Sequence, residues 1–104
     1  MARASRSYRE EMLKDLKDPA EAAAYLNAAL EDGSQEMFLM ALRDVADATG
    51  MLSLAKKSAL NRESMYRMLS ANGNPQLSSL SALLKTLGLR LAVDVERAGA
   101  NESP

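Results

Sequence analysis

The chain has 104 residues, of which 47% are hydrophobic and 26% charged, the composition of one folded domain with a single modest core. Cys and His are absent, which excludes disulfides, thiol nucleophiles, zinc sites built from these residues and histidine acid–base catalysis, so we expect no enzyme, metal or cofactor. The net charge is −1. No stretch is apolar enough for a membrane span, and the first 15 residues lack an apolar signal segment, so the cytoplasm is the expected compartment.

The first two helices are predicted before Gly33. In the N-terminal segment, residues 1–17, the apolar side chains recur at helical spacing and predict a short helix: Tyr8, Met12, Leu13 and Leu16. Asp18 can cap the next helix, Pro19 suits its first position, and Glu21 follows the cap by three residues. We expect this helix over residues 19–32, with Gly33 as its left-handed end. Its apolar face comprises Ala22, Leu26, Ala29 and Leu30.

A third helix is expected over residues 35–49, capped by Ser34 and closed by Gly50. Its apolar stripe comprises Phe38, Ala41, Leu42 and Val45, opposite the outward-facing Glu36, Arg43, Asp44 and Asp47. Five methionines could form a pliable binding surface, but their helical spacing favours core filler: Met37, Met40, Met51, Met65 and Met68. The carboxylates of residues 10–32 could be mistaken for an acid–base pair or a magnesium site. Because they lie at exposed, capping or terminal positions, we interpret them as a solvated acidic face.

After Gly50 the apolar pattern shortens, and residues 53–70 predict two short helices joined by a turn, with Asn61 capping the second. This is the geometry of a helix-turn-helix. A small side chain at Ala55 allows the helices to cross closely. The packing residues of the motif are Leu54, Ala55, Leu60, Met65 and Met68.

The outward side chains of the second helix suit the major groove of DNA. Arg67 is the leading candidate for reading a guanine, and Tyr66 can stack on a base or cover the rim of the groove. The candidate DNA-binding residues are Ser53, Lys57, Asn61, Arg62, Glu63, Ser64, Tyr66, Arg67 and Asn72. Residues 53–97 carry a net charge of +4, whereas residues 1–52 carry −4, which favours a polyanionic partner over a purely structural role for the motif.

The end of the chain combines a turn, a helix and a strand. A turn is expected at residues 72–75, because Gly and Asn tolerate positive φ and Pro ends the preceding helix. The last helix carries Leu77, Leu80, Leu84 and Leu87, and it ends at Gly88. It completes a helical domain over residues 18–88. Residues 98–104 are expected to be a flexible tail.

Residues 89–97 alternate apolar and polar side chains, which predicts one half-buried strand. Its apolar side chains are Leu89, Leu91, Val93 and Val95. Because a lone strand needs a partner, we expect it to pair with its own copy in a homodimer or with another protein. The alternative is an extended tail packed on the helices.

The stretch from Leu54 to Gly88 resembles the helix-turn-helix of the Cro and lambda-repressor type without a gap. The resemblance rests on Leu54-Ala55, Leu60 before the cap Asn61, Met65 and Met68, the turn at Pro75, and the helix from Leu80 to Leu87. Over residues 18–95 the chain resembles more specifically the addiction-module antidote proteins, the antitoxins of the HigA-like group. That likeness rests on Tyr25 to Leu30, Gly50-Met51, Arg62-Glu63-Ser64 and Leu87 to Leu91. Ala59 stands where the family usually has Gly, so the turn must tolerate a Cβ, and Ser53 can cap the first helix.

Pattern and resemblance together predict an all-α fold of five to six short helices with a lambda-repressor-like helix-turn-helix and one C-terminal β-strand. The resemblance implies a dimeric antitoxin that binds operator DNA, represses its own operon and neutralises a RelE-like ribonuclease toxin by direct binding. Such toxins are basic, so either the acidic first half or the C-terminal strand would contact the toxin. The alternative function is a stand-alone transcriptional repressor or prophage regulator without a toxin. Neither a membrane nor a small-molecule substrate is expected.

Overall fold

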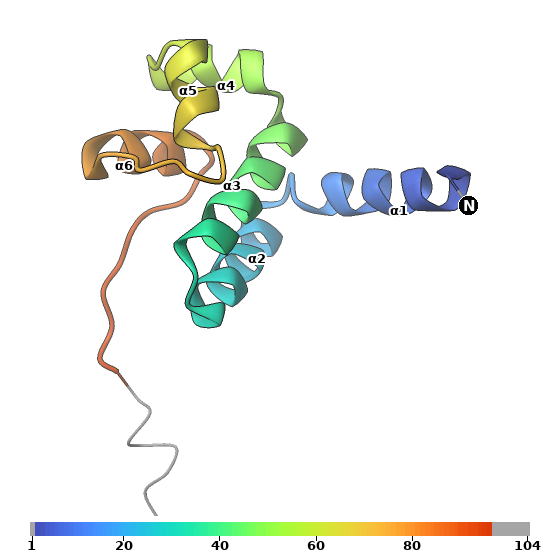
Figure 1. Cartoon of the computed structure of the whole chain (residues 1–104), viewed down its shortest axis with the longest axis horizontal. Helices are drawn as coiled ribbons and strands as arrows, with labels where there is room; N and C mark the ends of the chain where they lie inside the picture. The colour runs from blue at the N-terminus through green and yellow to red at the C-terminus, as the bar shows by residue number, and fades with distance from the viewer. Residues whose placement is uncertain (1, 97–104) are drawn as a thin grey trace, which may run out of the picture.

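The computed structural model describes residues 2–96, with side chains from Tyr8 onward. Over this range the chain forms six α-helices and no strand, which confirms the all-α class (Figure 1). The helices are α1 (Ala2–Asp15), α2 (Pro19–Asp32), α3 (Gln35–Thr49), α4 (Met51–Ser58), α5 (Arg62–Met68) and α6 (Leu77–Thr86). Within the described part of the chain, none of these helices combines the length and the apolar character that crossing a membrane requires.

The ends of α2 and α3 follow the predicted caps. The Asp18 carboxylate accepts a hydrogen bond from the Ala20 backbone N–H at 3.1 Å, and the Ser34 hydroxyl accepts one from the Met37 N–H at 3.1 Å. Gly33 ends α2 with φ of 90°, a left-handed conformation that glycine adopts at little cost. Both helices therefore have the predicted bounds.

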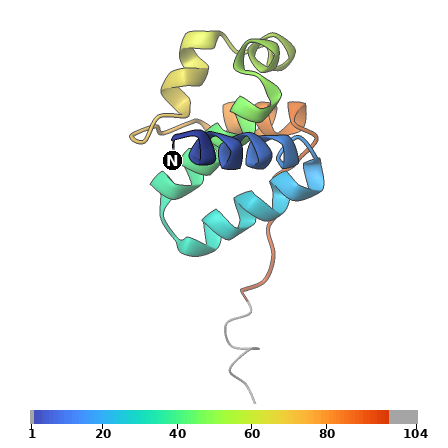
Figure 2. The ribbon, with the colours of Figure 1, turned by 90° about the vertical axis from the view of Figure 1, so that its right-hand side faces the viewer.

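The core is built around α3, which packs against α1, α2 and α4. Fully buried side chains come from α3, α4, α5 and α6: Leu39, Leu42, Val45, Leu54, Met65 and Leu83. Helices α2 and α3 form an antiparallel hairpin, and α4 and α5 lie at the end of the molecule opposite the turn of that hairpin (Figures 1 and 2). The hairpin and the α4–α5 pair can therefore present separate surfaces.

Four apolar side chains that the helical patterns assigned to the core are exposed instead. They are Leu30 (54% exposed), Met37 (47%), Met40 (54%) and Leu77 (69%). A helical pattern shows which side of a helix is apolar, but it does not show how much of that side the neighbouring elements cover. The other methionines assigned to the core are buried as predicted: Met51, Met65 and Met68.

The last helix ends as predicted, but no strand follows it in the described residues. Gly88 has φ of 83°. Its N–H donates a hydrogen bond to the Lys85 carbonyl at 3.0 Å, and the Leu89 N–H donates one to the Leu84 carbonyl at 2.8 Å, which is the arrangement of a Schellman motif. Beyond it residues 89–96 have no ladder partner; residues 89–92 line a surface hollow together with α2, and the segment then leads away from the helices (Figure 1). The prediction of a strand is wrong for this single chain, since a strand needs a second one to bond.

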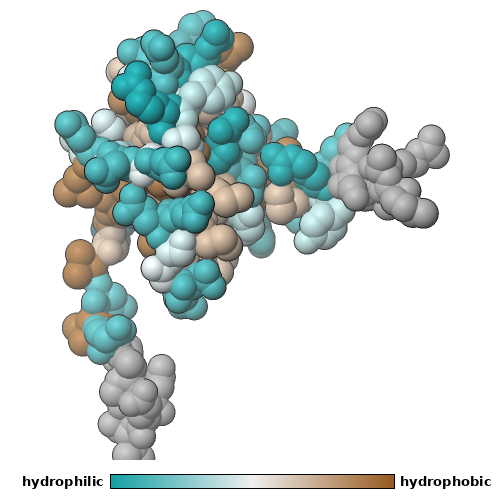
Figure 3. Space-filling model, viewed as in Figure 1, coloured by the Kyte–Doolittle hydropathy of each residue, from teal (hydrophilic) through white to brown (hydrophobic). Residues whose placement is uncertain are grey.

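The side chains of the extended segment divide into two groups. Leu89 is half-buried against the core, whereas Leu91 is 42% exposed, Val95 is 73% exposed and Val93 is fully exposed. Figure 3 shows hydrophobic surface along this segment, outside the helical body. The alternative of a tail packed on the helices therefore describes only its first residues. The last residue of the predicted strand and the predicted flexible tail, residues 97–104, lie outside the described residues.

Candidate functional site

Helices α4 and α5 are held together by a short connection of three residues. Ala59 ends α4 in the left-handed conformation, with φ of 62°, so this position does carry a Cβ at positive φ. The Asn61 side chain then caps α5, because its Oδ1 accepts a hydrogen bond from the Ser64 N–H at 2.7 Å. Helix α4 begins directly after Gly50, so Ser53 lies inside the helix and the prediction that it caps α4 is wrong.

The inward side chains of the two helices fix their crossing. Leu54 and Met65 are fully buried, Ala55 and Met68 are buried, and Leu60 in the connection is half-buried. A helix of seven residues is too short to be stable by itself. The close packing of these side chains therefore fixes both the position and the direction of α5. Helix α5 is thus a short element placed by the core.

The outward side chains of α5 remain open to solvent. Arg62, Glu63, Tyr66 and Arg67 are exposed and Ser64 is half-buried. No ion pair between described residues engages Arg62 or Arg67. Both guanidinium groups are therefore available to a ligand of the opposite charge.

Two surface hollows flank Leu60 and gather most of the candidate residues. One hollow is lined by Ser53, Lys56 and Arg62, and the other by Ser64, Arg67 and Asn72, each together with Leu60. Lys57 and Glu63 are exposed but line neither hollow. Lys56 was missed by the sequence analysis, although its position beside another lysine in the last turn of α4 was a usable signal.

The loop from α5 to α6 is fixed by close backbone contacts. A Cβ added at Gly73 would overlap the Met68 carbonyl oxygen, and Gln35 Nε2 of α3 donates a hydrogen bond to the Gly73 carbonyl at 3.0 Å. The turn was predicted at residues 72–75, but it lies at residues 70–73, where the Gly73 N–H donates a hydrogen bond to the Ser70 carbonyl at 2.9 Å, and Gly73 is not among the residues at positive φ. Glycine is needed here for a close approach. Asn72 is held by this loop beside Arg67.

A chain of charged contacts connects α1, α3 and α5. Arg9 Nη2 lies 3.4 Å from Asp47 Oδ2, Arg43 Nε lies 3.6 Å from Asp47 Oδ1, and the Arg43 guanidinium lies 5.2 Å from the centre of the Tyr66 ring. A cation at that distance from an aromatic ring is attracted to it. Arg43 therefore holds Tyr66 at one edge of the outward face of α5.

A second contact group lies beside the first. The Tyr25 hydroxyl donates a 2.6 Å hydrogen bond to Asp44 Oδ2, and Arg9 Nη1 lies 3.5 Å from Asp44 Oδ1. Burial raises the pKa of Tyr25 to about 12, and the hydrogen bond to Asp44 contributes to the increase. The sequence analysis missed both groups because they join distant segments. Only the spacing of Arg43 and Asp47, four residues apart on one helix, signalled a pair.

The surroundings of α5 are basic and those of the α2–α3 hairpin are acidic. Residues 51–96 contain six Lys/Arg and three Asp/Glu, whereas residues 19–49 contain one Lys/Arg and six Asp/Glu. The two ends of the molecule thus favour ligands of opposite charge.

Comparison with known proteins identifies the family. A family model described as "Probable addiction module antidote protein" matches residues 8–95. The chain belongs to this family. The match to the antidote family extends from α1 through α6 into the extended C-terminal segment. An uncharacterized protein of Haemophilus influenzae is 34% identical to the chain over 93 residues, which cover 84% of the chain and 96% of that protein. No solved structure matches the chain.

Proposed function

We propose that this chain is the antitoxin of a toxin–antitoxin module, and that it binds operator DNA through α4 and α5 acting as a helix-turn-helix. Membership of the antidote family supports the role of antitoxin. The observation that carries the DNA-binding part is the outward face of α5, where Arg62 and Arg67 are exposed and form no ion pair within the described part of the chain. Binding at its own operator would repress the operon that encodes the chain.

The dimensions of α5 suit this role. Seven helical residues are about 10 Å long, and the major groove, about 12 Å wide, admits an α-helix. Arg67 would read a guanine through its two acceptors, and Arg62 would lead at the start of the helix. Phosphate contacts would set the register of the protein on the duplex. They would come from Ser53, Lys56 and Lys57 and from the polar side chains beside Arg67, Ser64 and Asn72.

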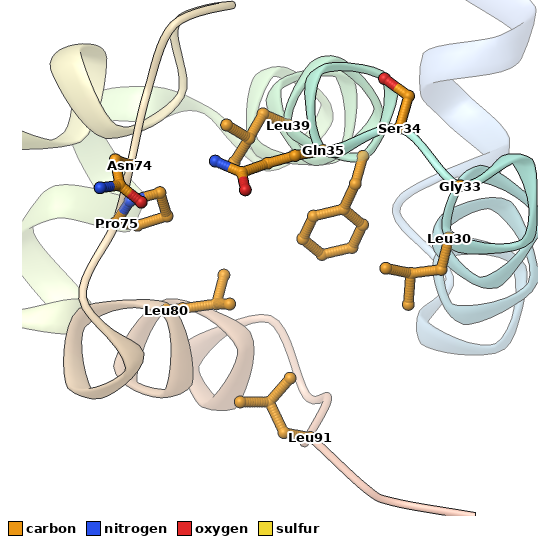
Figure 4. A pocket seen from close by; sticks show the side chains of 10 residues that line it. Leu30, Gly33, Ser34, Gln35, Leu39, Asn74, Pro75, Leu80 and Leu91 are labelled. Carbon is orange, nitrogen blue, oxygen red and sulfur yellow. The ribbon is translucent and has the colours of Figure 1, made fainter.

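The proposed DNA-binding unit is a homodimer. Val93 and Val95 project from the extended segment, and Leu91 faces a hollow lined by Leu30 and Leu80 (Figure 4). A second copy that pairs with this segment would give it the strand partner that one chain lacks, and would cover these apolar side chains. Two copies of α5 could then bind half-sites one turn of DNA apart.

The protein partner of the antitoxin would be its cognate toxin, which membership of the antidote family implies. We propose a RelE-like ribonuclease toxin that the chain neutralises in the cytoplasm by direct binding. The chain itself would perform no reaction and would need no cofactor.

The decisive variant for DNA binding is Arg67→Ala, with Lys85→Ala as a matched control. Lys85 lies in the last turn of α6, is exposed and lines neither hollow beside α5. Fluorescence anisotropy would compare the DNA upstream of the gene with a scrambled duplex. Arg67→Ala should weaken binding to the upstream DNA by about 1 to 3 kcal/mol and affect the scrambled duplex less. Equal loss on both duplexes would make Arg67 a phosphate contact, and wild-type protein that binds neither duplex would refute the proposal.

A further inference from the structure

The α2–α3 hairpin carries an apolar groove on its outer surface that the proposed DNA contacts do not use. We call it the methionine groove, and its lining includes Ala28, Ala29, Asp32, Met37, Met40 and Ala41. Both methionines are about half exposed in a region where the helical pattern predicted core. Exposed methionines next to small alanines form an adaptable apolar surface of the kind that binds other proteins.

The groove follows from helical periodicity. Each helix contributes residues at positions i, i+3, i+4 and i+7: α2 from Tyr25 to Asp32, and α3 from Met37 to Asp44. A stripe of this length extends about 10 Å. Because the helices are antiparallel, Asp32 lies near the turn of the hairpin and Asp44 lies at the far end. An apolar floor thus runs between two carboxylates.

The two carboxylates differ in their partners. Asp44 accepts the Tyr25 hydrogen bond and lies 3.5 Å from Arg9, so its charge is already satisfied. No ion pair or hydrogen bond to another described residue engages the Asp32 carboxylate, and none engages the neighbouring Glu31 or Glu36 carboxylates. The turn end of the groove is therefore an uncompensated negative region.

The negative region is electrostatically unfavourable for α2, the helix that carries Asp32. Glu31 and Asp32 occupy the last turn of α2, which contains no basic residue, although the negative end of a helix dipole favours cations. A cationic side chain placed there by a partner would offset both the dipole and the carboxylates. Local sequence choices that oppose the fold in this way tend to occur at functional sites.

We propose that the methionine groove docks a cationic surface of the cognate toxin, with an apolar side chain between Met37 and Met40 and a Lys or Arg beside Asp32. This inference rests on the proposed antitoxin function and selects the acidic half of the chain as the toxin contact. A second copy is disfavoured as the occupant, because it would bring two hairpins of six Asp/Glu and one Lys/Arg each into contact. DNA is disfavoured for the same reason.

The test is a calorimetric titration of the full-length chain with the purified protein product of the gene adjacent to its own, the candidate toxin. The variants are the double substitution Met37→Ala with Met40→Ala, and Asp32→Lys. Leu77→Ala is the matched control, since Leu77 is 69% exposed on α6, outside the groove. Alanine at exposed helical positions keeps the helices intact, and circular dichroism would verify this.

We expect each groove variant to bind the toxin at least about tenfold more weakly, and the control to stay within about twofold of wild type. Binding to upstream DNA should be unchanged in the double variant, because α5 lies at the end of the molecule opposite the turn between α2 and α3 (Figures 1 and 2). If both groove variants bound the toxin as tightly as the wild-type chain does, the groove would be refuted as the docking site, and the proposed antitoxin function would still stand. Loss of toxin binding in Val93→Lys alone would place the contact on the C-terminal segment, and a changed assembly state in the double variant would identify a second copy as the occupant. A wild-type chain that does not bind the toxin would refute both proposals.

Discussion

The substitution Ala59→Gly tests the backbone of the connection between α4 and α5. Ala59 has φ of 62°, and an L-residue in the left-handed region costs about 1 to 2 kcal/mol relative to right-handed backbone. Glycine removes that cost but returns about 0.4 to 1 kcal/mol of conformational entropy to the unfolded chain. The variant should therefore be more stable by about 0.5 to 1 kcal/mol, which corresponds to a rise in Tm of about 2 to 8 °C for a domain of this size.

Thermal unfolding followed by circular dichroism measures this change, and Ala24→Gly is its matched control. Ala24 is exposed in the interior of α2, where glycine should cost about 1 kcal/mol of helix propensity and lower Tm by several degrees. The same substitution is thus expected to act in opposite directions at two positions. If Ala59→Gly lowered Tm as the control does, the left-handed assignment of Ala59 would be refuted.

Further expectations concern the core, the alkaline range and the assembly state. Because Met65 is fully buried beneath α5, Met65→Ala should lower the free energy of unfolding in urea by about 2 to 5 kcal/mol, and a loss below about 1 kcal/mol would contradict that burial. The pKa of Tyr25 is raised in the fold from 10.0 to about 12, so its protonated phenol contributes stability that is fully present below pH 10.0 and is lost as pH rises toward 12. Tyr25→Phe should remove that part of the alkaline loss, and identical pH dependence in both proteins would refute it. Val93→Lys should lower the molar mass measured by light scattering, whereas an unchanged mass would move the dimer contact to the helices.

The local signals of the sequence predicted the helices well. Caps and stops such as Asp18, Ser34, Asn61 and Gly88 act within a few residues of where they stand, so their effect can be read without knowing the rest of the fold. The bounds of α2 and α3 follow from them. Ser53 shows the limit of this reasoning: it suits a cap, but α4 already begins at Met51, so Ser53 lies inside the helix.

Features that depend on distant contacts could not be predicted in the same way. A helical pattern shows which side of α3 is apolar but not how far the neighbouring helix covers it, and for that reason Met37 and Met40 were assigned to the core. The pairing of Tyr25 with Asp44 joins residues 19 positions apart and has no local signature. The need for glycine at position 73 likewise comes from the Met68 carbonyl and not from the turn itself.

The C-terminal segment illustrates a different limit. Its alternation of apolar and polar residues is that of a half-buried strand, but a strand exists only where a second strand bonds to it. In one chain the apolar side chains of Val93 and Val95 are left exposed. The alternating pattern alone therefore predicts a strand wherever a partner is available, and within one chain the described residues provide none.

The salt dependence of operator binding tests the central claim most directly. The wild-type chain and Lys57→Ala, which removes one exposed charge from the last turn of α4, would be titrated onto the DNA upstream of the gene at increasing NaCl concentration. Binding through exposed basic side chains predicts an affinity that falls steeply with salt, with the logarithmic slope reduced by roughly one in the variant. An affinity that does not change with salt would contradict the account.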